Sequence, residues 1–300
     1  MPANTRVPNQ LAVTRGVGYI TGFVTSRDGA TIGYRQFGQG PGVALVHGAM
    51  ESAQSHMQLA EALADSFTVY LPDRRGRGLS APYGEAYAMC KEVEDLEALL
   101  TTVDAHAVFG VSAGGLICLQ AALTLPIIHK AALYEPALIV HDSISTAWVS
   151  RYDRELAQGK VAAALVMGMK GARMGPPILN AMPNWLLESL TNSMMKSEDK
   201  KAKDGDVTMH MLAPTLHYDF QLVVEMRETQ ERYREVRAET LLLGGSKSPA
   251  YLKQALDALE QVLPHVTRIE FPGLDHGASG NADRGGKPER VAQELRQFFA

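Results

Sequence analysis

Short apolar runs alternate with longer helix-compatible stretches along most of this chain, and this alternation limits the possible folds more than any other feature. The apolar runs lie at residues 42–46, 67–71, 106–109 and 130–134, and helices are expected over 51–65, 88–102 and 115–123. The run at 42–46 is wholly apolar, as a strand buried on both faces should be. Strand–helix alternation therefore predicts an α/β fold, with a mostly parallel, doubly wound sheet and helices on both faces.

The alternation is preceded by a hairpin and interrupted once. Residues 22–26 and 30–37 predict two strands joined at Asp28-Gly29, a pair that favours a tight turn. After an irregular helical stretch, strands return at 239–243 and 266–271, followed by helices at 249–263 and 287–299. We expect a core of residues 1–136 and 237–300, with a helical cap at 137–236 on the side of the sheet where loops form sites.

A G-x-S-x-G pentapeptide, Gly110 to Gly114, lies where the strand at 106–109 gives way to a helix. A serine in this context sits on a sharp turn, whose strained backbone the flanking glycines tolerate. Its hydroxyl stands above the sheet, and the N-terminus of the following helix favours developing negative charge. The pattern predicts Ser112 as a nucleophile. The alternative is an ordinary glycine-rich turn with a capping serine.

A serine hydroxyl is a poor nucleophile until a base takes its proton, so a histidine is needed. Of the nine histidines, His276 lies in the loop between the last strand and the final helix, where an imidazole can lean over the sheet towards Ser112. General base catalysis is worth about 10²–10⁴ in rate. We expect His276 to be the base, and the alternative is a loop histidine that caps backbone groups.

Backbone amides must stabilise the oxyanion of the tetrahedral intermediate. The amide of Ala113 directly follows Ser112, and the amide of Ala49 follows Gly48, which allows close approach just after the strand at 42–46. Both amides are predicted oxyanion donors, and Gly48 and Met50 are expected to line the substrate site. His47 is expected to fix this loop and has no place in the predicted triad.

Together these features resemble the α/β-hydrolase superfamily. The matching motifs are His47-Gly48, the Gly110–Gly114 pentapeptide, His276 in a Gly-x-x-His sequence, and the turn Asp73-Arg74-Arg75-Gly76-Arg77-Gly78-Leu79-Ser80. The resemblance covers about residues 20–136 and 237–300. It implies an eight-stranded sheet whose second strand is antiparallel, with a lid after strand six, where residues 137–236 lie. It says little about substrate.

The third member of the triad departs from the commonest pattern of the superfamily. Many relatives carry an aspartate after strand seven, but residues 244–249 here contain no carboxylate. Some members take the acid from the end of strand six, and Glu135 stands there. Glu135 is therefore our candidate, because it can hold the tautomer of His276. Asp142, Asp275 and a Ser–His dyad are alternatives, as is a Glu135 that caps a helix or binds an arginine of residues 74–77.

Two further groups of residues each allow two roles. Arg74, Arg75 and Arg77 are expected to lie on the surface, while Asp73 ties the turn to nearby amides. An anchor for an anionic substrate is the alternative. The predicted cap is also rich in methionine, whose flexible thioether suits an irregular apolar pocket, although packing between the helices of the cap is the favoured explanation for most of these residues. The predicted cap holds both tryptophans, Trp148 and Trp185, and nine of the 13 methionines: Met167, Met169, Met174, Met182, Met194, Met195, Met209, Met211 and Met226.

Composition narrows the function classes. The net charge of −4 and the absence of a basic stripe disfavour nucleic acid as a partner. No apolar run approaches the length of a membrane span, and the two cysteines form no disulfide framework, so we expect a cytoplasmic protein. The histidines show no metal-ligand spacing, and neither a metal nor a cofactor is expected. The oligomeric state stays open, with a homodimer as one form considered.

These features predict a cofactor-independent serine hydrolase that cleaves an ester, lactone or thioester of a largely apolar small molecule through an acyl-enzyme. A carboxylesterase or lactonase is the first choice. A carbon–carbon bond hydrolase or perhydrolase is an alternative with the same constellation, and acyl transfer differs only in the acceptor. A ligand sensor with slow or single turnover is the alternative from another class.

Overall fold

The computed structural model describes residues 14–15, 18–174 and 181–300. Its strands are β1 (Thr14–Arg15), β2 (Ile20–Thr25), β3 (Thr31–Phe37), β4 (Gly42–Val46), β5 (Thr68–Pro72), β6 (Ala107–Val111), β7 (Lys130–Tyr134), β8 (Glu239–Gly245) and β9 (Val266–Phe271). The core helices are η1 (Ala53–His56), α1 (Met57–Leu63), α2 (Met89–Val103), α3 (Ala113–Thr124), α10 (Ala250–Val262), η3 (Ala282–Arg284) and α11 (Pro288–Phe299).

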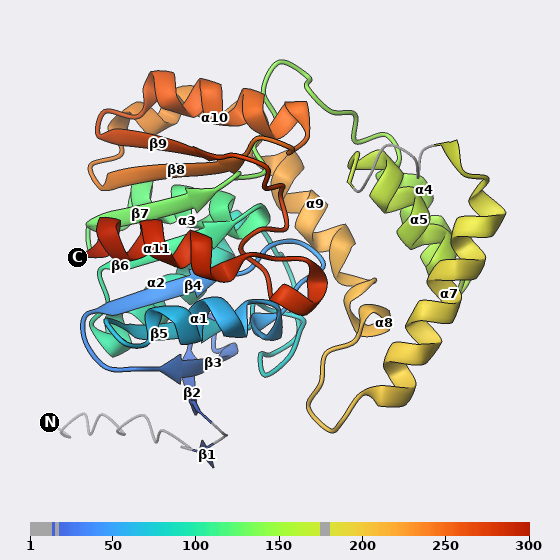
Figure 1. The fold of residues 1–300 in the computed structure, drawn as a ribbon, viewed down its shortest axis with the longest axis horizontal. Coiled ribbons are helices and arrows are strands. Elements are labelled where there is room, and N and C mark those ends of the chain that lie inside the picture. Colours follow the sequence, from blue (N-terminus) through green and yellow to red (C-terminus); the bar gives the residue numbers. More distant parts are fainter. Residues whose placement is uncertain (1–13, 16–17, 175–180) are drawn as a thin grey trace, which may run out of the picture.

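Within the described residues the strands form one sheet in the order β1-β2-β3-β5-β4-β6-β7-β8-β9 (Figure 1). β3 is antiparallel to both of its neighbours, β2 and β5, while the pairs from β5 to β9 are all parallel. The expected eight-stranded sheet with an antiparallel second strand is therefore confirmed as β2–β9. The two-residue β1 adds a short antiparallel edge to it.

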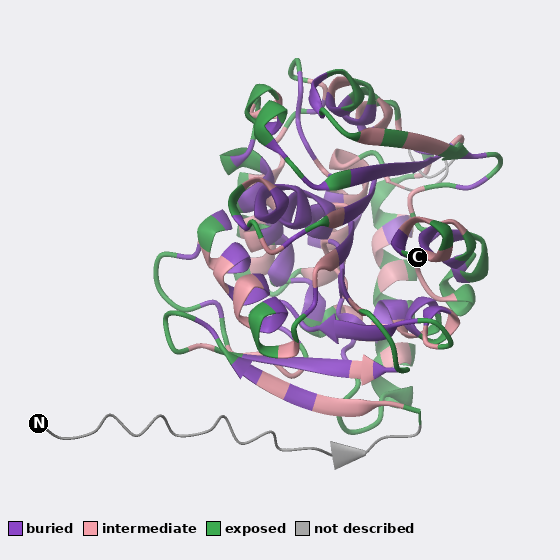
Figure 2. Ribbon diagram, turned by 90° about the vertical axis from the view of Figure 1, so that its left-hand side faces the viewer, coloured by how far each residue is buried: buried purple, intermediate pink, exposed green. Residues whose placement is uncertain are grey.

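The parallel strands are buried on both faces, which explains their apolar sequences. In β4, Ala44 and Val46 pack with α2, α3 and α10 on one side, whereas Val43 and Leu45 pack with α1 and α11 on the other. Successive side chains of a strand point to opposite faces, so each strand contributes to both layers. Figure 2 shows the central strands as almost entirely buried. This packing fixes the carboxyl ends of the strands, where the candidate site lies.

The described part of residues 137–236, called here the inserted segment, lies between β7 and β8 and contains helices and no strand. Its elements are α4 (Val149–Ala157), α5 (Val161–Gly171), α7 (Asn184–Lys201), α8 (Met209–Leu212), α9 (Thr215–Glu225) and η2 (Gln230–Glu235). α9 packs on α3 of the core and on α4, so it joins the two parts of the molecule. Figure 1 shows α4, α5 and α7 outside α9, away from the sheet.

Across the ranges that the structure describes, every helix is too short or too polar to cross a lipid bilayer.

Candidate active site

Ser112 lies on a sharp turn between β6 and α3. Its backbone has φ 56° and ψ −119°, in the strained region expected for this pentapeptide. A β-carbon at Gly110 would lie 2.4 Å from Gly114 O, and one at Gly114 would lie 2.2 Å from Val46 O. Neither position therefore accepts a side chain. The half-buried Ser112 stands at the N-terminus of α3, whose dipole favours negative charge there.

The backbone of Ser112 is tied to the end of β7. The Ser112 amide donates to Tyr134 O (3.0 Å), and the Ala137 amide donates to Ser112 O (3.1 Å). These bonds bring the carboxyl ends of β6 and β7 together. Residue 135, directly after β7, therefore lies at the same edge of the sheet as Ser112.

Glu135 and His276 are joined by a short hydrogen bond. Glu135 Oε2 lies 2.6 Å from His276 Nδ1, and the carboxylate is fully buried. The other oxygen, Oε1, accepts the amide of Gly245 (2.7 Å). Glu135 has φ 46°, which turns the chain away from the line of β7. The carboxylate is thus held from two sides, and Nδ1 of His276 is engaged.

The other sequence candidates for the acid do not contact His276. Asp142 is exposed and pairs with Arg227. Asp275 Oδ1 accepts the amide of Gly277 (3.0 Å). Among the described residues, Glu135 is the one of these three carboxylates that bonds to His276. No arginine of residues 74–77 bonds to Glu135 in the described structure.

The segment from the end of β8 to residue 249 contains no carboxylate. It borders the Glu135 carboxylate with Gly244, which leaves room for it, and with the amide of Gly245. A β-carbon at Gly244 would lie 3.1 Å from Glu135 Oε1 and 2.6 Å from Leu256 Cδ1. Ser246 Oγ accepts the amide of Gly273 (2.8 Å), at the start of the loop that carries His276. Gly244 and Gly245 are therefore part of the site, which the sequence reasoning missed. The consecutive glycines at the end of a strand were the available signal.

The loop of residues 47–50 borders Ser112. A β-carbon at Gly48 would lie 3.1 Å from Ser112 Cβ. His47 is buried, with Nδ1 3.0 Å from Gly48 O and Nε2 accepting the amide of Arg74 (3.1 Å). Burial, together with the positive charges of Arg77 and Arg74, holds the pKa of His47 well below its usual value. A neutral His47 fixes this loop, as the sequence suggested.

Two amides of this loop are held by carboxylates. Gly48 donates to Glu51 Oε2 (2.7 Å), and Met50, with φ 57°, donates to Asp219 Oδ2 (3.2 Å). Within the described part of the chain, the Ala49 amide forms no hydrogen bond with the protein, whereas the amides of Gly48 and Met50 on either side of it do. Ala113 occupies the first position of α3, directly after Ser112.

A second carboxylate–imidazole pair lies beside the loop. Glu51 Oε2 is 2.9 Å from His56 Nε2, and His56 Nδ1 donates to Ser279 O (3.0 Å). Burial raises the pKa of Glu51, but the charge and hydrogen bond of His56 outweigh it and lower the pKa to about 2. Burial lowers the pKa of His56, but Glu51 outweighs it, and the net shift is upward. The sequence reasoning missed this pair.

The expectation that the arginines of the Asp73 turn lie on the surface is wrong. Arg74, Arg75 and Arg77 are all buried. Arg74 pairs with Glu92 (2.9 Å) and Asp219 (2.9 Å), Arg77 with Asp219 (3.0 Å), and Arg75 with Asp95 (2.6 Å) and Asp28 (2.7 Å). Buried charges require such partners, and most of these lie on α2 and α9, far away in the sequence.

The role expected for Asp73 is confirmed. Its carboxylate accepts the amides of Ala53 (2.8 Å) and Leu79 (3.0 Å), and it also pairs with Arg35 (2.8 Å).

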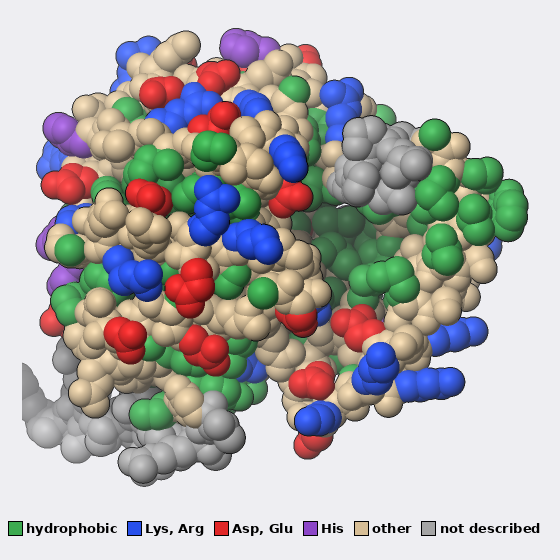
Figure 3. Space-filling view, in the orientation of Figure 1, with side chains coloured by type: hydrophobic (Ala, Val, Ile, Leu, Met, Phe, Trp, Pro, Cys, Tyr) green, Lys and Arg blue, Asp and Glu red, His purple; other side chains and the backbone are tan. Residues whose placement is uncertain are grey.

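An apolar cluster from the inserted segment packs on the 47–50 loop. Tyr152, Ala164 and Leu216 form a buried apolar cluster, and the side chains that pack against it are Ala49 and Met50 of the loop together with Trp148, Leu156, Met167 and Phe220. Figure 3 shows a hollow between the core and the outer helices, with hydrophobic side chains deep inside it. Of the methionines in the segment, Met195 and Met226 are buried, Met194 and Met211 are exposed, and Met167 joins this cluster.

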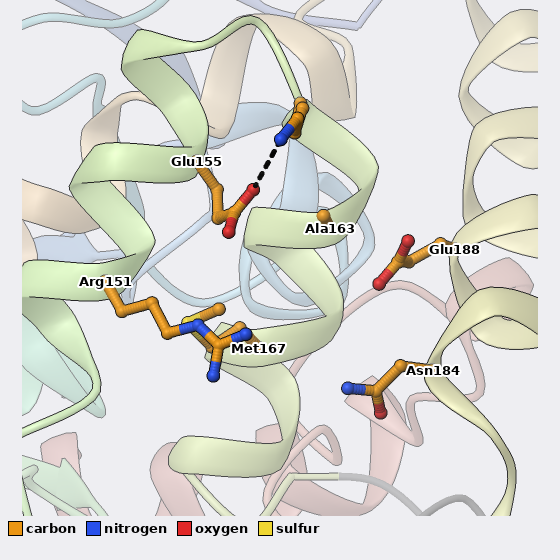
Figure 4. A pocket seen from close by; sticks show the side chains of 7 residues that line it. Arg151, Glu155, Ala163, Met167, Asn184 and Glu188 are labelled. Atoms are coloured by element: carbon orange, nitrogen blue, oxygen red, sulfur yellow. Dashed lines mark ion pairs between the residues drawn. The ribbon is translucent and has the colours of Figure 1, made fainter.

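A separate cavity of about 300 Å³ lies within the inserted segment, between α4, α5 and α7 (Figure 4). Its lining includes Arg151, Asn184 and Glu188, and an ion pair of 3.8 Å between Glu155 and Lys160. None of the candidate catalytic residues lines it, and the charged groups in it offer no activated nucleophile.

Comparison with known proteins bears on the family of this chain. The model of the alpha/beta hydrolase family matches residues 43–294. The chain is 22% identical over 264 residues to a pimeloyl-[acyl-carrier protein] methyl ester esterase of Xanthomonas axonopodis pv. citri, covering 88% of this chain and 96% of that protein. It is 35% identical over 81 residues to a non-heme chloroperoxidase of Kitasatospora aureofaciens, which is 27% of this chain and 30% of that protein.

Among solved structures, an alpha/beta hydrolase from Sphaerobacter thermophilus superposes with a TM-score of 0.75 and 29% identity, over 93% of this chain and 100% of that one. The family match spans most of the chain, and it includes the turn of Ser112 and the loop of His276. The chain belongs to the alpha/beta hydrolase family.

Proposed function

We propose that this protein is a serine hydrolase that cleaves an ester, lactone or thioester of a largely apolar small molecule. Ser112, His276 and Glu135 form its catalytic triad. The observation that carries the proposal is the buried 2.6 Å hydrogen bond between Glu135 and His276, at the edge of the sheet where Ser112 stands. A carboxylate that engages Nδ1 fixes the tautomer of the imidazole and leaves Nε2 as the base.

In the proposed reaction, His276 Nε2 takes the hydroxyl proton of Ser112 while Oγ attacks the carbonyl carbon. The tetrahedral intermediate collapses as the imidazolium gives this proton to the leaving alcohol or thiol, and an acyl-enzyme remains. Water then attacks the acyl carbon with His276 again as base, and the acid is released with Ser112 restored. Glu135 stabilises the imidazolium in both halves of the reaction.

The amides of Ala49 and Ala113 hold the oxyanion. The position of Gly48 against Ser112 and the engagement of the neighbouring amides by Glu51 and Asp219 support the assignment of Ala49. Loss of one such donor typically costs about 10²–10³ in turnover. Gly48 and Met50 line the substrate site beside these amides.

The inserted segment acts as a cap that supplies an apolar pocket. Ala49 and Met50 pack against the same cluster as Trp148, Met167 and Phe220 of the segment, and this shared packing supports the role. The similarity to a protein named as a methyl ester esterase supports ester chemistry. The free cysteines Cys90 and Cys118 fit a reducing compartment such as the cytoplasm.

A perhydrolase is the second candidate, and the short stretch similar to a non-heme chloroperoxidase favours it. The chemistry differs only in the acceptor, because hydrogen peroxide replaces water in the attack on the acyl-enzyme. Turnover of an ester in the presence and absence of peroxide, with peracid measured directly, separates the two candidates.

The experiment that tests the proposal is hydrolysis of nitrophenyl esters of rising acyl length by the wild-type protein and by Ser112→Ala and His276→Gln. We expect many turnovers by the wild type and a loss of at least 10³-fold, roughly the share of a triad, in both variants. Asp142→Asn is the matched control. Wild-type release of one equivalent without further turnover would favour the ligand sensor instead.

A further inference from the structure

Asp219 is a buried carboxylate of the inserted segment for which the proposed mechanism has no role. It lies on α9, and its side chain is completely buried. Oδ1 accepts hydrogen bonds from Arg74 Nη1 (2.9 Å) and Arg77 Nη2 (3.0 Å), and Oδ2 accepts the amide of Met50 (3.2 Å). One side chain of the segment therefore binds two core arginines and the 47–50 loop at once.

Both arginines also reach the backbone around Ala49. Arg74 Nη1 donates to Gly48 O (3.4 Å), and Arg77 Nη1 donates to Glu51 O (3.1 Å). Asp219 and its arginines thus hold the chain on both sides of Ala49. The backbone of Met50 has a positive φ of 57°. A residue other than glycine keeps such an angle only where the surrounding structure imposes it.

Gly48 O belongs to the peptide unit that carries the Ala49 amide. In a trans peptide the C=O and N–H point in opposite directions. Arg74 and His47 Nδ1 bind the carbonyl from one side, so the Ala49 amide points to the other. Since the Gly48 backbone borders Ser112 Cβ, the direction of this single peptide decides whether the amide is available beside the nucleophile.

We propose that Asp219 is a positioning residue that keeps the Gly48–Ala49 peptide in the orientation needed to bind the oxyanion. It acts through Arg74, Arg77 and the Met50 amide. This role rests on the proposed function. It also makes the oxyanion hole depend on how α9 sits on the core, because Leu216 of the same helix belongs to the cluster against which Ala49 and Met50 pack. The inserted segment then completes the catalytic site as well as covering it.

The test compares Asp219→Asn with the wild type on a nitrophenyl ester and on the matching thionoester. A thionoester places sulfur, a weaker hydrogen-bond acceptor, where the oxyanion forms, so the ratio of the two rates reports on the oxyanion hole. We expect Asp219→Asn to lower kcat for the ester about 10- to 100-fold, below the cost of losing a donor outright. KM should change less than about threefold, and the ester-to-thionoester ratio should fall.

Asp95→Asn is the matched control. Asp95 is also a buried carboxylate, paired with Arg75 of the same turn, but the hydrogen bonds of the Arg75 side chain within the described residues go to Asp95, Asp28 and Ser26 and not to residues 48–51. The Asp95→Asn variant should have a lower melting temperature than the wild type, with kcat and the ester-to-thionoester ratio unchanged. If Asp219→Asn fails to fold, Arg77→Lys serves instead: a lysine keeps the charge but cannot bridge Asp219 and Glu51 O as a guanidinium does.

A folded Asp219→Asn with unchanged kcat and ratio overturns the positioning role, as does an equal loss of kcat in Asp95→Asn. Failure of the proposed function looks different, because the wild type itself then shows neither ester turnover nor modification of Ser112.

Discussion

Glu135 Oε2 lies 2.6 Å from Nδ1 of His276, although 141 residues separate them. Their neighbours are joined as well, since the hydroxyl of Tyr134 donates to Asp275 O (2.7 Å). Two adjacent hydrogen bonds therefore hold the loop after β9 over the end of β7. Replacing Glu135 therefore removes the one carboxylate of the described residues that bonds to His276.

Glu135→Gln should lower kcat about 10²–10⁴-fold, because the amide no longer stabilises the imidazolium or fixes its tautomer. Steady-state kinetics on a nitrophenyl ester measure this, with melting temperature to show that the variant is folded. The control is Asp142→Asn, whose carboxylate is exposed and paired with Arg227. A loss below tenfold in Glu135→Gln, combined with inactivity of Asp142→Asn, would falsify the assignment of the acid.

Gly244→Ala should also reduce activity, through Glu135. The added methyl group would meet Leu256 Cδ1 at 2.6 Å and Glu135 Oε1 at 3.1 Å. We expect about 1–3 kcal/mol of lost stability from overpacking and a fall in kcat. Adding Leu256→Ala to this variant should relieve the closer contact and recover activity, as kinetics on the single and double variants will measure. No recovery would mean that crowding against Leu256 is not the cause of the lost activity.

The pair of Glu51 and His56 should make stability depend on pH. The lowered pKa of Glu51 contributes stability above its ordinary value of 4.5, and this is lost as the pH falls towards about 2. The raised pKa of His56 contributes stability below its ordinary value of 6.5, and this is lost as the pH rises through the higher value in the folded protein.

Glu51→Gln should therefore differ most from the wild type in melting temperature between pH 4.5 and 6.5. Thermal unfolding across this range and up to about pH 9 measures the difference, which should shrink at the alkaline end. A constant difference across that range contradicts the ion pair as its source.

Asp73→Asn should destabilise the fold by about 3–5 kcal/mol, since it leaves the buried Arg35 without its partner. Urea unfolding measures this change. The control is Asp257→Asn, which removes an exposed ion pair with Arg268 (2.5 Å) and should change stability by less than about 1 kcal/mol. Equal effects of the two variants would contradict the structural role assigned to the Asp73 turn.

Trp148→Ala should change the preference for acyl length. Trp148 packs edge-on against Phe220 (4.4 Å between ring centroids), and both side chains pack against the same buried cluster as Ala49 and Met50. We expect KM for long nitrophenyl esters to rise about tenfold, with little change for acetate, since burying an aromatic side chain is worth about 1.5–3 kcal/mol. Trp185→Ala is the control, because Trp185 is 70% exposed in the same segment. A uniform change across all lengths argues against an acyl pocket there.

The sequence allowed the sheet and much of the candidate site to be predicted because local pattern controls both. The runs at 42–46, 130–134 and 266–271 became β4, β7 and β9 with unchanged bounds. Glu135 was found from its place at the end of a strand, and the structure joins it to His276.

Contacts between distant segments could not be predicted from patterns in the sequence. Arginine is usually exposed, and nothing near Arg74 in the sequence reveals that Glu92 on α2 and Asp219 on α9 surround it. The pairing of Glu51 with His56 also depends on the bend at η1, where the expected helix over 51–65 is replaced by a 3-10 turn followed by α1. Such partners follow from the packing of whole elements.

The proposed mechanism depends on Ser112 being an activated nucleophile. Labelling with a fluorophosphonate, followed by peptide mass spectrometry, tests it most directly. We expect one adduct per chain on Ser112, formed at least 10²-fold faster than in Glu135→Gln, in line with the role of the acid. No adduct on the wild type, or an adduct on another residue, contradicts the account.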